Sequence, residues 1–147
     1  MKIKKINEIF GEEETHWMFA YGSLSNTKLR HLLLDEVLPV IACKISKELG
    51  YKRKWIQNRK LDSITSGIFE NENPVDINGI IFPIKDIDFA KLDDYEYGYK
   101  RFEMSWDSII IDNKDSYVNS KLWIYLPDQE YIKPDLYKNL PTVYVDY

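Results

Sequence analysis

The stretch at residues 16–26, which reads His-Trp-Met-Phe-Ala-Tyr-Gly-Ser-Leu-Ser-Asn, most constrains what this chain can fold into. Its apolar and aromatic first half is typical of a buried β-strand, and Gly22 permits backbone angles that other residues avoid. Ser23, Ser25 and Asn26 are residue types that form turns and cap helices. We therefore expect a strand–turn–helix corner, whose unpaired backbone N–H groups would form a small anion or oxyanion pocket.

The corner does not carry a nucleotide-binding motif. It matches neither G-x-x-x-x-G-K-[ST] nor G-x-G-x-x-G, so the sequence does not specifically indicate a nucleotide phosphate. On residue chemistry alone, an ordinary structural corner is the commoner interpretation, and it stays open at this point.

Hydrophobic periodicity predicts the elements that follow the corner. Strands are expected at residues 40–45, 50–56, 64–69, 101–110 and 117–126. Helices are expected from Asn26 until Pro39 and over residues 86–96, where Gly98 ends the second one. The apolar stripe of the first helix is predicted to contain Leu29, Leu32, Leu33 and Val37. Asn78-Gly79, inside an apolar run, suggests a bend or a bulge. Many strands with two short helices indicate an α+β fold with an antiparallel or mixed sheet.

Composition limits the possible functions. A length of 147 residues predicts a single domain over residues 1–147, and a net charge of −4 argues against a nucleic-acid-binding surface. No apolar run approaches the ~20 residues of a membrane helix, so we expect a soluble, cytoplasmic protein without a membrane partner. Cys43 is the only cysteine and lies in an apolar run, where a buried structural thiol is expected.

Glu96 is the candidate catalytic residue. It is predicted to lie at the C-terminal end of the second helix, among Tyr95, Tyr97 and Tyr99. The helix dipole and the loss of water would both raise the pKa of this carboxyl group, which suits a general base near neutral pH. On residue chemistry alone, an exposed acid at a helix end is the commoner interpretation. No histidine or cysteine lies close enough in sequence to suggest a metal site.

Five segments in succession carry a family resemblance. They are Phe-Ala-Tyr-Gly-Ser at 19–23, Val-Asp-Ile-Asn-Gly-Ile-Ile-Phe at 75–82, Leu-Asp-Asp-Tyr-Glu-Tyr-Gly-Tyr-Lys-Arg at 92–101, Leu-Trp-Ile-Tyr at 122–125 and Pro-Thr-Val-Tyr at 141–144. In this order and spacing they resemble the γ-glutamylcyclotransferase-like (AIG2-like) family over residues 17–147. The resemblance implies a sheet that curls into a small β-barrel with two or so helices beside it.

The resemblance also implies a reaction and a site. The α-amino group of a small γ-glutamyl compound would attack its own side-chain carbonyl, which releases 5-oxoproline and an amine or amino acid. Glu96 would be the general acid/base, and no metal or cofactor would take part. Substrate contacts would come from Tyr21, Gly22, Ser23, Leu24, Tyr99, Tyr125 and Tyr144. The protein would act as a monomer or homodimer.

Further interpretations stay open on the sequence. The same pocket could bind a small metabolite without turnover, or persist in a structural protein. A desolvated carboxylate at Glu96 favours catalysis over these alternatives. The tyrosine-rich rim near Trp55 predicts an apolar or aromatic leaving amine. Arg53 and Arg59 are the candidates to hold a second carboxylate, although a solvated strand face is the commoner role for them.

Overall fold

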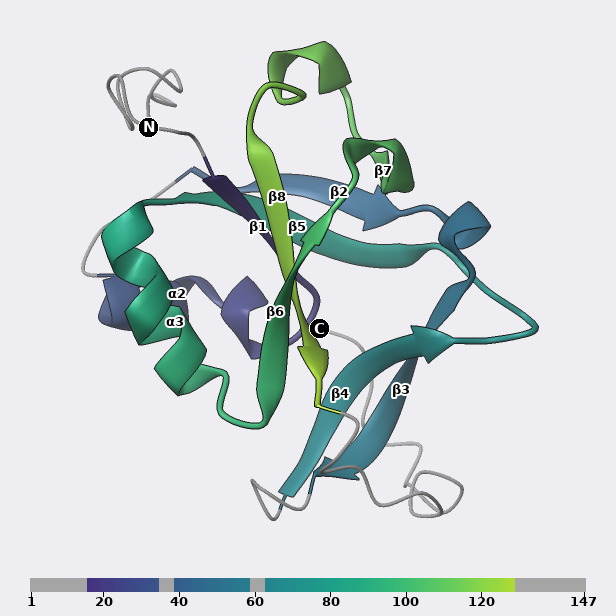
Figure 1. Cartoon of the computed structure of the whole chain (residues 1–147), viewed down its shortest axis with the longest axis horizontal. Coiled ribbons are helices and arrows are strands. Elements are labelled where there is room, and N and C mark those ends of the chain that lie inside the picture. Colours follow the sequence, from purple (N-terminus) through teal and green to yellow (C-terminus); the bar gives the residue numbers. More distant parts are fainter. Residues whose placement is uncertain (1–15, 35–38, 59–62, 129–147) are drawn as a thin grey trace.

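The computed structural model describes residues 16–34, 39–58 and 63–128 (Figure 1). Its helices are α2 (Thr27–Leu34) and α3 (Phe89–Tyr95). Its strands are β1 (His16–Ala20), β2 (Ile41–Ile45), β3 (Tyr51–Asn58), β4 (Ser63–Glu70), β5 (Ile77–Ile84), β6 (Tyr99–Met104), β7 (Ile109–Ile110) and β8 (Lys121–Pro127). Short 3₁₀ turns lie at Ser23–Ser25, Lys47–Leu49, Asp86–Asp88, Trp106–Ser108 and Lys114–Ser116.

Within these residues, six strands form one mixed sheet in the order β6-β8-β1-β5-β2-β7, while β3 and β4 form a separate hairpin. β1 runs parallel to β8, and the other neighbouring strands are antiparallel. Figure 1 shows β6 and β8 crossing β2 and β5 at a steep angle, so the sheet curls into a half-barrel. The predicted α+β class, with a curled mixed sheet and flanking helices, is confirmed.

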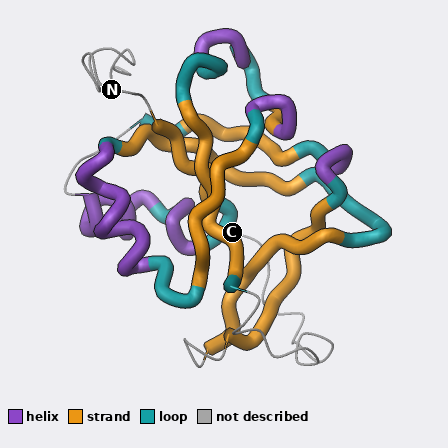
Figure 2. Tube along the Cα trace, viewed as in Figure 1, coloured by secondary structure: helices purple, strands orange, loops and turns teal. Residues whose placement is uncertain are grey.

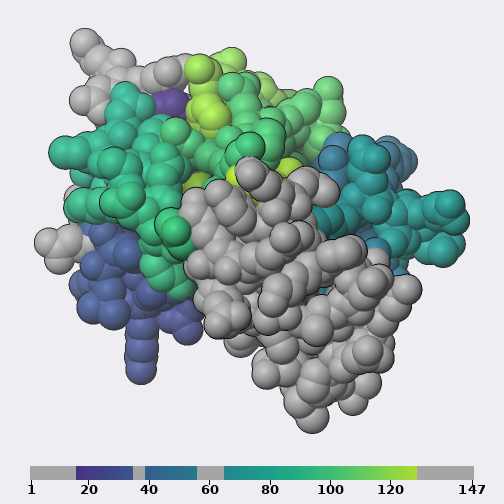
Figure 3. Space-filling view, turned by 60° about the horizontal axis from the view of Figure 1, so that its bottom comes forward, coloured from purple at the N-terminus to yellow at the C-terminus, as the bar shows by residue number. Residues whose placement is uncertain are grey.

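The central strand β1 is buried along its whole length, because both faces of the sheet are covered. Trp17 and Phe19 pack into a core on one face, with side chains of β2, β4, β5 and β8. Met18 and Ala20 point to the opposite face, where α2 and α3 cover them. Figure 2 shows the two helices together on one side of the strands. In Figure 3 the helices and the connection between β4 and β5 lie at opposite sides of the molecule.

The corner after β1 forms as expected. The chain enters the 3₁₀ turn Ser23–Ser25 at Gly22, and the Asn26 side chain then caps α2 by accepting a hydrogen bond from the Leu29 N–H at 3.1 Å. The second helix ends where predicted, because Gly98 adopts a positive φ of 93° after α3. The start of α2 and the end of α3 are therefore both set by local residue chemistry.

The predicted apolar stripe of the first helix is wrong at Leu32, whose side chain is 81% exposed. Arg30 is buried instead, and its guanidinium donates hydrogen bonds to the Leu24 carbonyl at 2.9 Å and to Thr27 Oγ1 at 3.2 Å. Val37 lies outside the described residues. The helix is therefore turned so that a charged side chain, satisfied by polar partners, fills a core position.

The predicted strand at residues 101–110 is divided in two. β6 ends at Met104, and the Ser105 side chain caps a 3₁₀ turn by accepting a hydrogen bond from the Asp107 N–H at 3.2 Å. Trp106 is buried, and its indole N–H donates to the Ser120 carbonyl at 2.7 Å. The turn at Ser105 therefore ends β6, and the indole of Trp106 packs into the core from within this turn.

The expected bend or bulge at Asn78-Gly79 is also wrong, since β5 keeps a regular register with β2 through both residues. The glycine is needed for a close approach. A Cβ atom at Gly79 would lie 2.4 Å from Cζ of Phe19 and 2.6 Å from the carbonyl oxygen of Ala20. Absence of a side chain thus lets β5 pass beneath the end of β1 that leads to the corner.

We predict that Gly79→Ala lowers the free energy of unfolding by about 1–3 kcal/mol, because the added methyl group must displace an aromatic ring and a backbone carbonyl. Urea denaturation measures the change. Asn78→Ala is the matched control, since that side chain is exposed, and it should change stability by less than about 0.5 kcal/mol. Equal stability of Gly79→Ala and wild type would contradict the close approach.

Candidate functional site

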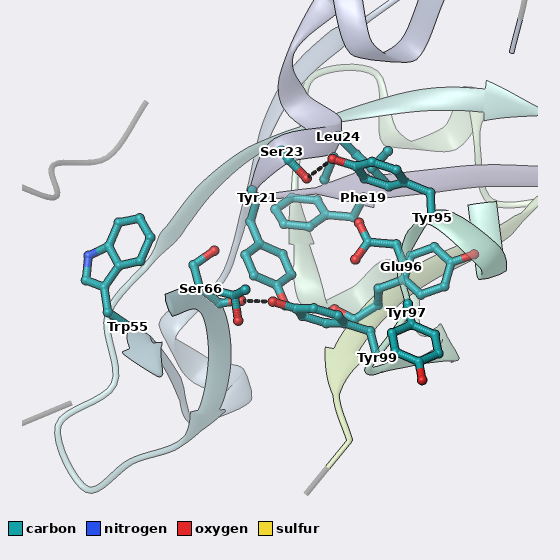
Figure 4. Close-up of a pocket in the computed structure, with 14 residues that line it drawn as sticks. Phe19, Tyr21, Ser23, Leu24, Trp55, Ser66, Tyr95, Glu96, Tyr97 and Tyr99 are labelled. Carbon is teal, nitrogen blue, oxygen red and sulfur yellow. Dashed lines mark hydrogen bonds between the residues drawn. The ribbon is translucent and has the colours of Figure 1, made fainter. Parts of the chain in front are cut away.

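A pocket of about 310 Å³ opens where the β1 corner, the C-terminal end of α3 and the β3–β4 hairpin meet (Figure 4). The residues that line it are Phe19, Ala20, Tyr21, Gly22, Ser23, Leu24, Trp55, Thr65, Ser66, Tyr95, Glu96, Tyr97, Tyr99 and Tyr125. Seven of these lining residues are aromatic and one is acidic. The pocket is therefore a largely aromatic cavity that contains one carboxyl group.

The β1 corner forms one wall and presents backbone donors. The carbonyls of Gly22 and Ser23 accept hydrogen bonds from Ser25 and Asn26, each at 3.0 Å. The N–H groups at the start of a helical turn have no partner within the turn, so those of Ser23 and Leu24 are the candidates to bind a ligand here. A side chain at Gly22 would press on Ser66, because a Cβ atom there would lie 3.2 Å from Oγ of Ser66.

Glu96 follows the last residue of α3, and its carboxyl group is directed into the space between Phe19, Tyr95 and Tyr99 (Figure 4). Its backbone is held, because the N–H donates to the Leu92 carbonyl at 2.8 Å and the carbonyl accepts from the Tyr99 N–H at 2.9 Å. Within the described part of the chain, no group donates a hydrogen bond to its carboxylate. Burial without a compensating partner raises the pKa of Glu96 to about 7.

The hydroxyl groups of several pocket tyrosines donate hydrogen bonds to protein acceptors. Tyr21 donates to the carbonyl of Tyr125 at 2.7 Å, and Tyr99 donates to the carbonyl of Ser66 at 2.8 Å. Tyr95 donates to Oγ of Ser23 at 3.0 Å. Burial raises the pKa of Tyr21, Tyr99 and Tyr125, so these phenols stay protonated. They present their rings to the cavity while their hydroxyl groups join the surrounding elements.

The structure brings most of the sequence-predicted site residues to this one pocket. Those that line it are Tyr21, Gly22, Ser23, Leu24, Glu96, Tyr99 and Tyr125, whereas Tyr144 and Arg59 lie outside the described residues. Arg53 is not among the lining residues. Its guanidinium donates to the Asn78 carbonyl at 3.0 Å and lies 5.8 Å from the centre of the Tyr21 ring.

Sequence reasoning missed Thr65, Ser66 and the tie between Tyr95 and Ser23. The hairpin residues come close to Gly22 through the fold, across more than 40 positions of sequence, and carry no motif of their own. The only available signal was Gly67, whose Cβ would lie 2.3 Å from Cγ of Pro127. A strand glycine of this kind marks a close approach but does not say to which element.

A search of the described residues finds no group of three His, Cys, Asp or Glu side chains that could hold a metal ion. In the same residues, no helix is long and apolar enough to cross a membrane. Cys43 is buried in the core on the far side of β1 from the helices, and burial raises the pKa of its thiol to about 12. The thiol is therefore protonated and packed as a small apolar side chain.

Comparison with protein families gives a match to the family described as gamma-glutamyl cyclotransferase, AIG2-like, over residues 18–142. A comparison with curated proteins finds no match. Among solved structures, one named gamma-glutamyl cyclotransferase aligns with a TM-score of 0.61 at 15% identity, over 82% of this chain and 69% of the other.

Two further structures show the same arrangement. A protein of Arabidopsis thaliana aligns with a TM-score of 0.60 at 18% identity, over 84% of this chain and 75% of its own. A yeast gamma-glutamyl cyclotransferase specific to glutathione aligns with a TM-score of 0.52 at 11% identity, over 84% and 75% of the two chains. At such identities these three likenesses show a shared fold.

The buried carboxyl group should make stability depend on pH. The pKa of Glu96 is about 7 in the folded protein against an ordinary value of 4.5, so the folded state binds more protons between these pH values. The free energy of unfolding therefore falls as pH rises through this window, by up to about 3 kcal/mol at about 1.4 kcal/mol per pKa unit.

Glu96→Gln cannot ionise, and we predict that it is more stable than wild type at pH 8 and close to wild type at pH 4. Urea denaturation at both pH values measures the difference. Asp94→Asn, at an exposed neighbouring position, is the control and should follow the wild-type pH dependence. A Glu96→Gln protein with no stability gain at pH 8 would show that Glu96 is solvated.

Proposed function

The chain belongs to the gamma-glutamyl cyclotransferase, AIG2-like family, and we propose that it converts a small γ-glutamyl compound into 5-oxoproline and a free amine, with Glu96 as general acid/base. The observation that carries this proposal is the buried carboxyl group of Glu96, which receives no hydrogen bond from the described residues and lines the same pocket as the β1 corner. Family membership supports the reaction class. Geometry supports the assignment of the base.

The proposed reaction is an intramolecular acyl transfer. The α-nitrogen of the glutamyl group forms a bond to the side-chain carbonyl carbon, and the bond from this carbon to the leaving nitrogen breaks. The attacking nitrogen starts as an ammonium and ends as a lactam N–H, while the amide nitrogen leaves as an ammonium. Two protons therefore pass from one nitrogen to the other, and no oxidant, water or metal is consumed.

Glu96 is suited to carry these protons one at a time. With a pKa of about 7, it is partly ionised at neutral pH and can both accept a proton from the attacking ammonium and return one to the leaving nitrogen. Because ring closure is intramolecular, the pocket chiefly needs to hold the folded conformer of the substrate. The aromatic walls at Phe19, Tyr21 and Tyr99 exclude the extended conformers and bulk water.

The β1 corner supplies the complementary electrostatics. The N–H groups of Ser23 and Leu24 would hold the α-carboxylate of the glutamyl group or the oxyanion that develops at the attacked carbonyl. Backbone donors suit this role because they are fixed before the substrate arrives. Glycine at position 22 leaves this wall of the pocket without a side chain, because any side chain there would press on Ser66.

The leaving half of the substrate would extend toward Trp55, which lies across the pocket from Glu96 (Figure 4). This side of the pocket is formed by the indole of Trp55 and the hydroxyl-bearing Thr65 and Ser66. None of the described lining residues is basic, and Arg53 is engaged with the Asn78 carbonyl. We therefore expect an apolar or aromatic amine in preference to a leaving group that carries a second carboxylate.

The decisive experiment is a panel of γ-glutamyl compounds with detection of free 5-oxoproline. It includes γ-glutamyl amino acids, glutathione, γ-glutamyl-ε-lysine and γ-glutamyl derivatives of aliphatic and aromatic amines. Turnover of at least one member is expected, with the highest kcat/KM for an apolar or aromatic amine. If no member reacts while one stabilises the protein thermally, the pocket is a binding module without turnover.

Glu96→Gln should lower kcat by about 10²- to 10⁴-fold, the usual contribution of a general base, while KM changes little because the side chains have the same shape. Steady-state kinetics on the best substrate of the panel measures both constants. Cys43→Ser is the control and should retain wild-type kinetics, since the thiol lies outside the pocket. Near-normal turnover by Glu96→Gln would assign proton transfer to another group.

A further inference from the structure

Three hydrogen bonds donated by tyrosine hydroxyl groups join α3, the β1 corner and β8 into a closed circuit next to Glu96. It starts at α3, where the Tyr95 hydroxyl donates to Oγ of Ser23 at 3.0 Å. From the β1 corner, the Tyr21 hydroxyl donates to the carbonyl of Tyr125 on β8 at 2.7 Å. The Tyr125 hydroxyl then returns to α3, because it donates to Oδ1 of Asp93 at 2.5 Å.

The circuit joins elements that are far apart in sequence. Its bonds span 72, 104 and 32 residues, so none of them follows from local geometry. Each joins one pocket wall to another: α3 to the corner, the corner to β8, and β8 back to α3. Glu96 comes directly after Tyr95, at the point where α3 gives way to the turn into β6. The circuit therefore holds the base-bearing end of α3 at a set distance from the corner.

Asp93 also lies close to a cationic side chain. Its Oδ2 lies 3.6 Å from the Arg101 guanidinium, which stacks over the Phe89 ring at 3.7 Å and lies 5.1 Å from the Trp123 ring. Arg101 is thus packed against aromatic rings of α3 and β8, with its charge beside Asp93. A carboxylate that is fixed in this way can fix the phenol of Tyr125 in turn.

We propose that Asp93 and Tyr95 are positioning residues for Glu96: through Tyr125 and Ser23 they fasten the end of α3 to the β1 corner, so that the carboxyl group stays inside the pocket opposite the backbone N–H groups. Neither residue needs to touch the substrate for this role. The inference rests on the proposed function for what Glu96 does there, but the placement of its carboxyl group can be measured without turnover.

The first test is kinetic. Tyr95→Phe and Asp93→Ala should each lower kcat/KM by about 10- to 100-fold, the range expected when a catalytic group is displaced by about 1 Å. Asp93→Asn keeps an oxygen that accepts from Tyr125, and it should retain clearly more activity than Asp93→Ala. Asp93→Ala combined with Tyr125→Phe should be no worse than Asp93→Ala alone, because both changes remove the same bond.

The second test is the titration of Glu96, followed by carbon-detected NMR of the glutamate side chains. Tyr95→Phe and Asp93→Ala should release the carboxyl group toward water and lower its pKa from about 7 toward its ordinary value. The titratable groups that share the pocket with it are the phenols of Tyr21, Tyr95, Tyr97, Tyr99 and Tyr125. Burial raises the pKa of Tyr21, Tyr99 and Tyr125, so these three stay protonated in this range. Asp93→Asn removes the same charge as Asp93→Ala, so a larger fall in the alanine variant isolates the lost hydrogen bond.

Two controls match these changes. Asp94→Asn removes an exposed neighbouring carboxylate, and Tyr117→Phe removes a hydroxyl from the core on the opposite face of the sheet. Both should leave kcat/KM and the pKa of Glu96 unchanged. Folded Asp93→Ala and Tyr95→Phe proteins that differ from wild type only in melting temperature would overturn the proposal.

The experiments test the proposed function and the positioning role of Asp93 and Tyr95 independently. If wild type releases no 5-oxoproline from the whole panel, the proposed function fails, and the NMR titration still decides whether Asp93 and Tyr95 hold Glu96. If wild type turns over but the pKa of Glu96 is the same in all variants, the positioning role fails and the proposed function stands.

Discussion

Burial of β1 on both faces is the constraint on which the rest of the structure depends. Because helices cover one face of the sheet and the second core covers the other, all five residues of this strand are buried. The position of the buried strand therefore determines the position of the corner at residues 21–24, which follows it directly. Both the pocket and the start of α2 are built outward from that corner, and Gly79 allows β5 to pass close beneath it.

Desolvation raises the pKa of both kinds of titratable group in the pocket, the phenols and the carboxyl group, but only the phenols have protein partners among the described residues. The phenols of Tyr21, Tyr99 and Tyr125 are satisfied by protein oxygens, so burial keeps them protonated and makes them ties between elements. The carboxyl group of Glu96 receives no such partner from the described residues, so burial shifts its pKa toward neutrality. The same aromatic surroundings thus favour the hydrogen-bonded phenols of the pocket walls and disfavour the ionised form of Glu96.

A buried carboxyl group with a raised pKa lowers the stability of the folded protein as pH rises through neutrality. Hydrogen bonds and ring contacts join the elements around this group. Tyr95, Asp93 and Tyr125 link α3, the corner and β8, and Arg101 packs over Phe89 behind them.

The sequence by itself determined the features that depend on neighbouring residues. Apolar periodicity and turn residues predicted β1, its corner, the cap at Asn26 and the stop at Gly98, and thereby the place of Glu96 at a helix end. Tertiary structure decided what depends on distant partners. It buried Arg30 while leaving Leu32 exposed, broke the strand at Ser105 so that Trp106 enters the core, and brought Ser66 to the pocket. Hydrogen bonds that span 32 to 104 residues have no signature in local sequence, because the curl of the sheet alone selects which tyrosine hydroxyl meets which acceptor.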